Sequence, residues 1–148
     1  MKIFIDSDHN GFAMRHELAD YLRRSGHDVV DVGTPTQDPN DDFPLAASRV
    51  VASIRAADDS DSRGILICGS GQGVCMAANR FKGIRASLCW DNWEAKAARN
   101  DDDSNVLCLP ARVVSTDKAK TITHVWLTTA FAGASRFKRR ITLLDELA

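Results

Sequence analysis

The 148-residue sequence has no long hydrophobic run, no excess of one charge and little cysteine. Its apolar segments are too short to cross a bilayer, and residues 1–5 lead directly into Asp6, so we expect neither a membrane span nor a signal peptide. The net charge is -1, with basic residues spread along most of the chain, which gives no general attraction to nucleic acid or anionic membranes. We therefore expect a cytoplasmic protein with no nucleic-acid or membrane partner.

The four cysteines, Cys68, Cys75, Cys89 and Cys108, lack the paired spacing of a metal site. We expect them to be reduced, with the last three in the core and no metal bound. The chain also lacks repeats, linkers and low-complexity segments. Since 44% of its residues are hydrophobic and 26% charged, residues 1–148 are expected to form one domain.

Short apolar runs alternate with helical patterns along the chain. Strands are expected at 2–5, 29–32, 65–68, 86–90 and 105–109, and helices at 12–24, 43–57, from Gly73 to about Asn79, and at 91–99, 115–131 and 137–147. Five strands that alternate with helices predict an α/β fold, with a parallel sheet covered on both faces.

The central run 65–78 is a buried strand that passes through Gly69, Gly71 and Gly73 into a helix. The glycines let a ligand approach the backbone, and the unpaired N–H groups at the start of a helix attract anions. The same partial charge favours the reactive thiolate form of Cys68. Cys68 is therefore a candidate base or nucleophile.

Functional residue types follow several of the expected strands. They are Asp8 and His9, Cys68 to Ser70, Asp91 and Asn92, and Arg112. Ligands of open α/β sheets bind outside the carboxyl ends of the strands, so we expect these residues to converge on one site. Asp8 has a second interpretation, as a cap of the helix that follows it.

Known phosphate and thiol motifs fail on single residues. A dinucleotide fingerprint would need glycine, and a cysteine phosphatase loop arginine, where Val74 stands. A receiver domain would carry aspartate in place of Cys68. The glycine loop therefore matches none of these three motifs.

Further motifs occur along nearly the whole chain: DHNG at 8–11, DFP at 42–44, GILICGSGQG at 64–73, AANRFKGIR at 77–85, SNV at 104–106, ARVV at 111–114 and RFKRRI at 136–141. In sequence and order they resemble the family of ribose-5-phosphate isomerase type B and galactose-6-phosphate isomerase. The resemblance implies a Rossmann-like three-layer αβα sandwich with a five-stranded parallel sheet. It also implies a homodimer or dimer of dimers with the active site at the interface, and no metal or organic cofactor.

The implied activity is aldose-ketose isomerisation of a phosphorylated sugar through an enediol, with ribose 5-phosphate as the first candidate substrate. By resemblance, Cys68 is the base, and Ser70 with the backbone of Gly69, Gly71 and Gly73 stabilises the enediolate oxygen. The remaining implied roles are sugar binding for Asp8 and phosphate binding for His9, Arg112, Arg136 and Arg140. The last two are four residues apart and share a helix face.

Two positions depart from the family. Asp101 and Asp102 stand where the family has a His-Asn pair, whose histidine opens the sugar ring, and Phe43 replaces a tyrosine. An aspartate is ionised at neutral pH and is a poor proton donor, although Asp101 remains a candidate for this step and Asp102 for substrate binding. The alternatives are therefore an isomerase of another sugar phosphate, such as an acyclic tetrose or a hexose, a mixed oligomer whose second chain supplies the missing histidine, or a phosphosugar-binding protein without catalysis.

Overall fold

The structure of the protein, a computed structural model, describes residues 1–147. Within this range, parallel strands form a five-stranded sheet in the order β2-β1-β3-β5-β4. The strands are β1 (Lys2–Ser7), β2 (Asp28–Asp31), β3 (Arg63–Cys68), β4 (Ala86–Leu88) and β5 (Val106–Pro110). The predicted α/β fold and parallel sheet are confirmed.

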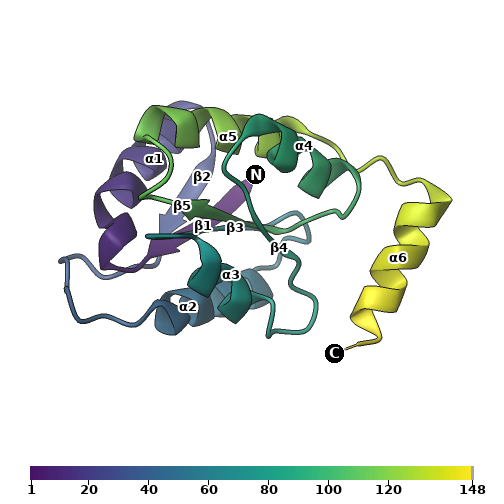
Figure 1. The fold of residues 1–148 in the computed structure, drawn as a ribbon, viewed down its shortest axis with the longest axis horizontal. Helices are drawn as coiled ribbons and strands as arrows, with labels where there is room; N and C mark the ends of the chain where they lie inside the picture. The colour runs from purple at the N-terminus through teal and green to yellow at the C-terminus, as the bar shows by residue number, and fades with distance from the viewer. Residues whose placement is uncertain (148) are drawn as a thin grey trace.

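Helices cover both faces of this sheet (Figure 1). One face carries α1 (Phe12–Arg24), α4 (Asn92–Asn100) and α5 (Thr116–Thr128), and the other carries α2 (Phe43–Ala56) and α3 (Gln72–Ala78). The result is the three-layer αβα sandwich. No helix within residues 1–147 is long and apolar enough to span a membrane.

The central strands are apolar on both faces because helices bury both. Alternate residues of β3 divide between the layers: Ile65 and Ile67 pack toward α1, α4 and α5, whereas Leu66 and Cys68 pack toward α2 and α3. Gly64 brings α2 close to the sheet, since an added Cβ would lie 2.7 Å from Val50 Cγ1. This packing fixes the position at which β3 delivers Cys68.

The C-terminal part differs from the predicted boundaries. The helix expected at 115–131 ends at Thr128, and α6 (Ser135–Asp145) begins two residues before the expected 137. In Figure 1, α6 stands apart from the sandwich at the end of the segment 129–134. Phe137 is the buried residue of α6, so the helix exposes apolar side chains, among them Leu143 and Leu144.

Candidate active site

The turn between β3 and α3 holds Cys68 with backbone donors close by. Cys68 is the last residue of β3 and is only 4% exposed. The backbone N–H of Gly71 donates to its Sγ over 3.1 Å. Gly71 has φ +74°, and a Cβ there would collide with Leu88, so both the backbone and the space require glycine. The turn therefore presents the sulfur beside a glycine backbone, as predicted from the sequence.

A pocket of about 310 Å³ opens over this turn. Its lining residues are Asp8, Asn10, Phe43, Cys68, Gly69, Ser70, Gly73, Arg112 and Val113. The structure thus brings together most of the predicted catalytic-loop residues with Asp8 and Arg112. Gly73 lies against Phe43, whose ring would be 2.9 Å from an added Cβ.

Backbone hydrogen bonds join the loops that form the pocket. Asp8 N donates to Ile67 O over 3.1 Å, and Arg112 N donates to Gly69 O over 2.9 Å. These bonds follow from the strand order, in which β3 lies between β1 and β5. The chain reverses direction across the sheet between β1 and β3, and ligands of such sheets bind at this switch point.

Asp8 caps a helix and also lies at the pocket. Its carboxylate caps the short 3₁₀ helix η1 (His9–Gly11), accepting from Asn10 N over 2.9 Å and Gly11 N over 3.3 Å. It also lines the pocket. Gly11 permits this arrangement because a Cβ there would meet Ile67 at 2.7 Å.

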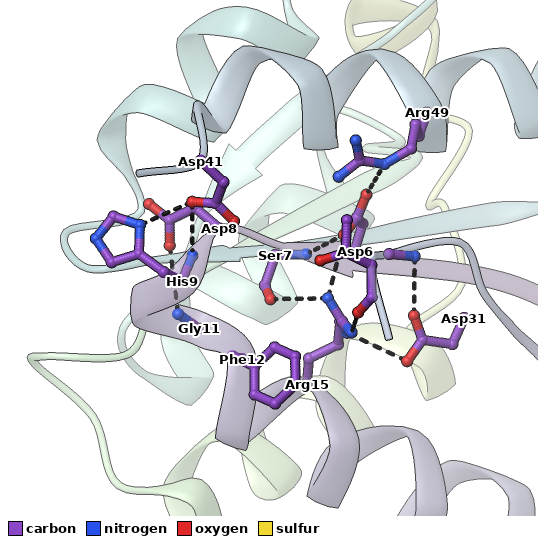
Figure 2. Close-up of polar contacts among 12 residues, drawn as sticks. Asp6, Ser7, Asp8, His9, Gly11, Phe12, Arg15, Asp31, Asp41 and Arg49 are labelled. Atoms are coloured by element: carbon purple, nitrogen blue, oxygen red, sulfur yellow. Dashed lines mark hydrogen bonds and ion pairs between the residues drawn. The ribbon is translucent and has the colours of Figure 1, made fainter. Parts of the chain in front are cut away.

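His9 is held by Asp41, a residue that the sequence did not identify. Nδ1 of His9 lies 2.7 Å from Asp41 Oδ1, and the His9 backbone N donates to the same oxygen over 3.0 Å (Figure 2). The hydrogen bond to Asp41 raises the pKa of His9, with a further contribution from the charge of Asp8. The pair with Asp41 therefore favours proton uptake by His9, whose side chain lies next to Asp8 but outside the pocket lining.

A buried ion network lies beneath this end of β1. Asp6, expected in a loop, belongs to β1, and its carboxylate accepts from Arg49 Nε over 2.7 Å and lies 3.4 Å from Arg15 Nη1. Arg15 also reaches Asp31 over 3.2 Å, and Phe12 covers its guanidinium (Figure 2). Burial raises the pKa of Asp6, against the lowering effect of Arg49. The network fixes the strand end from which Asp8 and His9 project.

Arg112 lies across the catalytic turn. Its Nη2 donates to Asn10 Oδ1 over 2.9 Å, and an added Cβ on Gly69 would be 3.3 Å from its Cδ. Gly69 therefore leaves room for the guanidinium beside Cys68. Of the three arginines predicted to bind the phosphate, Arg112 is the one that lines this pocket within residues 1–147.

The other predicted residues are absent from the lining of this pocket: His9 and Gly71, which adjoin lining residues in the chain, and Asp101, Asp102, Arg136 and Arg140. Asp101 and Asp102 precede β5 and so lie near the amino edge of the sheet, whereas Cys68 lies at the carboxyl edge. Asp102 lines a different cavity of about 600 Å³, together with Leu144 and Leu147. Burial and Asp101 raise the pKa of Asp102, while the charges of Arg140 and Arg85 oppose the rise.

Two expectations from the sequence are wrong. Asp91 and Asn92 do not line the pocket, because β4 is the outermost strand and Asp91 instead caps α4 through Trp93 N and Glu94 N. Cys75 is half-buried rather than in the core, whereas Cys89 and Cys108 are fully buried. All four thiols are unpaired.

Sequence reasoning missed Asn10, Asp41 and Val113. Asn10 belongs to the DHNG motif, but an asparagine there gives no functional signal of its own. Asp41 carried no local signal, since its loop joins His9 only in the folded chain, 32 residues away. Residues 1–147 contain no group of three or more His, Cys, Asp or Glu side chains arranged to hold a metal ion.

An α/β sandwich with a thiol, a carboxylate and an arginine at neighbouring strand ends belongs to the class of proteins that bind small ligands at the switch point of a parallel sheet. A model of the ribose/galactose isomerase family matches residues 3–144, and the chain belongs to this family. The probable ribose-5-phosphate isomerase B of Mycoplasma genitalium is 42% identical over 139 residues, which is 94% of this chain and 90% of the relative.

Solved structures agree with this assignment. Ribose-5-phosphate isomerase B of Clostridium thermocellum has a TM-score of 0.93 at 37% identity, covering 99% of this chain and 97% of that one. The M. genitalium enzyme with bound ribulose-5-phosphate has a TM-score of 0.92 at 39% identity, covering 99% and 95%. The resemblance inferred from the motifs is confirmed.

Proposed function

We propose that residues 1–148 form a single isomerase domain that interconverts an aldose phosphate and a ketose phosphate, with ribose 5-phosphate and ribulose 5-phosphate as the pair. The observation that carries this proposal is the position of Cys68, whose sulfur accepts from Gly71 N in a pocket shared with Asp8 and Arg112. Relatives and solved neighbours named ribose-5-phosphate isomerase B support the choice of substrate.

The proposed chemistry is a proton transfer between adjacent carbons. The Cys68 thiolate removes the proton from C2 of the open-chain aldose, and O1 gains a proton as the C1=O double bond becomes the enediol. The thiol then returns its proton to C1, while O2 loses its proton and becomes the ketone. Ser70 and the glycine backbone N–H groups stabilise the negative oxygen that develops between these steps. No atom is gained or lost overall.

The phosphate end of the substrate requires cations. His9 and Arg112 come from the same chain as Cys68, next to Asp8, which binds the sugar hydroxyls. We assign the rest of the clamp to Arg136 and Arg140 of the partner subunit in a homodimer or dimer of dimers. Asp101 and Asp102 of the partner subunit complete the sugar end of the site.

Two observations support an interface. Residues 101 and 102 are separated from the carboxyl edge by the length of β5, on the order of 15 Å at about 3.3 Å per residue, so they cannot serve the pocket of their own chain. Val113, which lines the pocket, is 68% exposed, and Trp93 at the start of α4 is 75% exposed. Exposed apolar side chains of this size favour burial against another subunit.

The four unpaired thiols fit a reducing compartment, and we place the protein in the cytoplasm.

A second substrate class is favoured by one observation, the aspartate at position 101. Its side chain accepts from Asn100 Nδ2 over 2.7 Å, and a carboxyl group takes the place of the histidine that would donate the proton for ring opening. A sugar phosphate that is mainly open-chain, such as a tetrose phosphate, needs no such donor. Comparing turnover of erythrose 4-phosphate with that of ribose 5-phosphate decides between the two substrates.

The test of the reaction itself is NMR in heavy water with ribose, allose, galactose and erythrose phosphates. Deuterium at C1 or C2 of one sugar, lost in Cys68→Ala, is the result expected of the enediol mechanism. Binding without exchange in the wild-type protein would replace the proposal with a phosphosugar-binding protein that lacks catalysis.

A further inference from the structure

A continuous hydrogen-bonded chain joins Asp41 to Arg112 beside the pocket. Arg112 Nη2 donates to Asn10 Oδ1 over 2.9 Å, and Asn10 Nδ2 lies 3.2 Å from His9 Nε2. On the other side of the ring, His9 Nδ1 lies 2.7 Å from Asp41 Oδ1 (Figure 2). The chain crosses from the loop before α2, through η1, to the end of β5, and thus connects three segments of the site.

The two ends of this chain fix the direction of every hydrogen bond in it. A guanidinium can only donate and a carboxylate can only accept. Asn10 therefore accepts from Arg112 through Oδ1 and donates through Nδ2 to His9 Nε2. The His9 ring then carries its single proton on Nδ1 and donates it to Asp41. In this arrangement His9 is neutral, and each of the three hydrogen bonds pairs one donor with one acceptor.

A second proton on His9 is incompatible with this arrangement. Nε2–H of His9 would face the NH₂ group of Asn10, so that two donors would meet with no acceptor between them. If the Asn10 amide turns to offer its oxygen to Nε2–H, its NH₂ group faces the donors of Arg112 instead. Protonation of His9 therefore releases the Arg112 guanidinium from Asn10.

We propose that Asp41 and Asn10 are positioning residues that couple the charge of His9 to the release of Arg112. The proposal rests on the proposed function, because the anion that would receive both freed donors is the substrate phosphate. A phosphate dianion needs several N–H donors at once. The hydrogen-bonded chain from Asp41 to Arg112 supplies donors from His9 and Arg112 together, and Asn10 holds these donors when no phosphate is bound. Asp41 thereby sets the pH at which His9 takes up a proton and Arg112 becomes available to an anion.

The charged groups around His9 agree with this role. Asp41 and Asp8 favour its cationic form and Arg112 opposes it, so the balance among them decides when the proton is taken up. Gln37, from the same loop as Asp41, donates to the His9 backbone O over 2.8 Å and adds no charge. The positive charge of Arg112 opposes protonation of His9. A phosphate anion that binds the released guanidinium neutralises this charge and so favours the protonated form of His9.

The first test follows His9 by NMR in the protein without substrate. Ring signals of labelled histidine are titrated with pH, and His9 is assigned by its loss in His9→Gln. In Asp41→Asn, which keeps the shape and removes the charge, the midpoint of His9 is expected to move to lower pH. The matched control is Asp38→Asn, which removes a charge from the same loop where the carboxylate contacts Asn40 N, and should leave the midpoint unchanged. Equal midpoints in wild type and Asp41→Asn would overturn the proposal.

The second test follows Arg112 through its Nε–H signal, assigned by its loss in Arg112→Lys. In the wild type this signal should move with the same midpoint as His9. In Asn10→Ala the coupling amide is gone, and the movement should be lost or strongly reduced. The proposal would be overturned if the Arg112 signal did not shift at the His9 midpoint in the wild type. It would also be overturned if the shift were as large in Asn10→Ala as in the wild type.

Kinetics with ribose 5-phosphate separates this inference from the proposed reaction. Asp41→Asn should raise KM about fivefold at pH 8 while kcat stays near the wild-type value, since a phosphate contact weakens and the base is untouched. A fall in kcat with KM unchanged would contradict a positioning role at the phosphate. A wild-type protein that isomerises nothing would disprove the proposed function, and the two titrations would still decide on the coupling of His9 and Arg112.

Discussion

The backbone N–H of Gly71 points at the sulfur of Cys68 across 3.1 Å. This contact exists because Gly71 adopts a left-handed conformation at the start of α3, with φ +74°. An N–H donor stabilises a thiolate more than a thiol, because it compensates negative charge on sulfur. The proposed base is therefore held by main-chain atoms, whose position depends on the fold and not on a flexible side chain.

Replacement of Cys68 by alanine should abolish isomerisation and spare binding. Loss of a general base costs about 10²- to 10⁴-fold in rate, whereas the cations and carboxylate that bind the sugar phosphate remain. Rates are measured with ribose 5-phosphate and affinity by calorimetry. Cys75→Ser is the control, since Cys75 lies outside the pocket lining, and it should retain wild-type rates. Normal turnover by Cys68→Ala would exclude this residue as the base.

Mixing two inactive variants should restore activity if the site is shared between subunits. Cys68→Ala removes the base and Arg140→Ala removes an arginine assigned to the partner subunit. A mixed dimer then has one intact site, so random exchange gives about a quarter of the wild-type rate. The mixture is assayed after reversible dissociation, with light scattering to establish the oligomeric state. No recovery in a mixture that forms dimers would mean that each chain builds its own site.

Gly33→Ala should destabilise the protein by disturbing the ion network under β1. A Cβ at position 33 would collide with the Arg15 guanidinium and the Asp6 carboxylate, both of which are buried. Displacing a buried ion pair costs about 3 kcal/mol in the free energy of unfolding, measured with urea. Thr34→Ala removes only a hydroxyl that donates to Thr36 O and should cost less than about 1 kcal/mol. Equal stabilities of the two variants would show that the network tolerates displacement.

The His9–Asp41 pair should make stability depend on pH in a defined direction. The hydrogen bond from Asp41 raises the pKa of His9 in the folded protein, so the folded state binds the proton more tightly than the unfolded state. The stabilisation is full below the unfolded pKa of histidine and is lost as the pH rises through the folded pKa. The difference in unfolding free energy between wild type and Asp41→Asn should therefore shrink with rising pH across this window. A difference that grows with pH would contradict the sign of the shift.

The sequence predicted most of the residues that line the pocket at the carboxyl edge, and its failures have physical causes. Cys68, Ser70 and Asp8 follow buried strands, and local pattern alone indicates that position. Asp91 has the same local signal, yet β4 is outermost in the sheet and Asp91 serves as a helix cap. The predicted first strand stops at Ile5, whereas Asp6 lies within β1, where Arg15 and Arg49 pair with its carboxylate.

By itself, the sequence determined the fold class, the family and the loop that carries the thiol, because strand and helix periodicity, glycine spacing and residue type are local properties of the chain. Only the tertiary structure decided which loops meet. The contact of Asp41 with His9, and of Asn10 with Arg112 across 102 residues of sequence, depends on strand order and on the path of the loop before α2. Such contacts leave no periodic signal in a single sequence, since each partner alone is an ordinary polar residue in a surface loop.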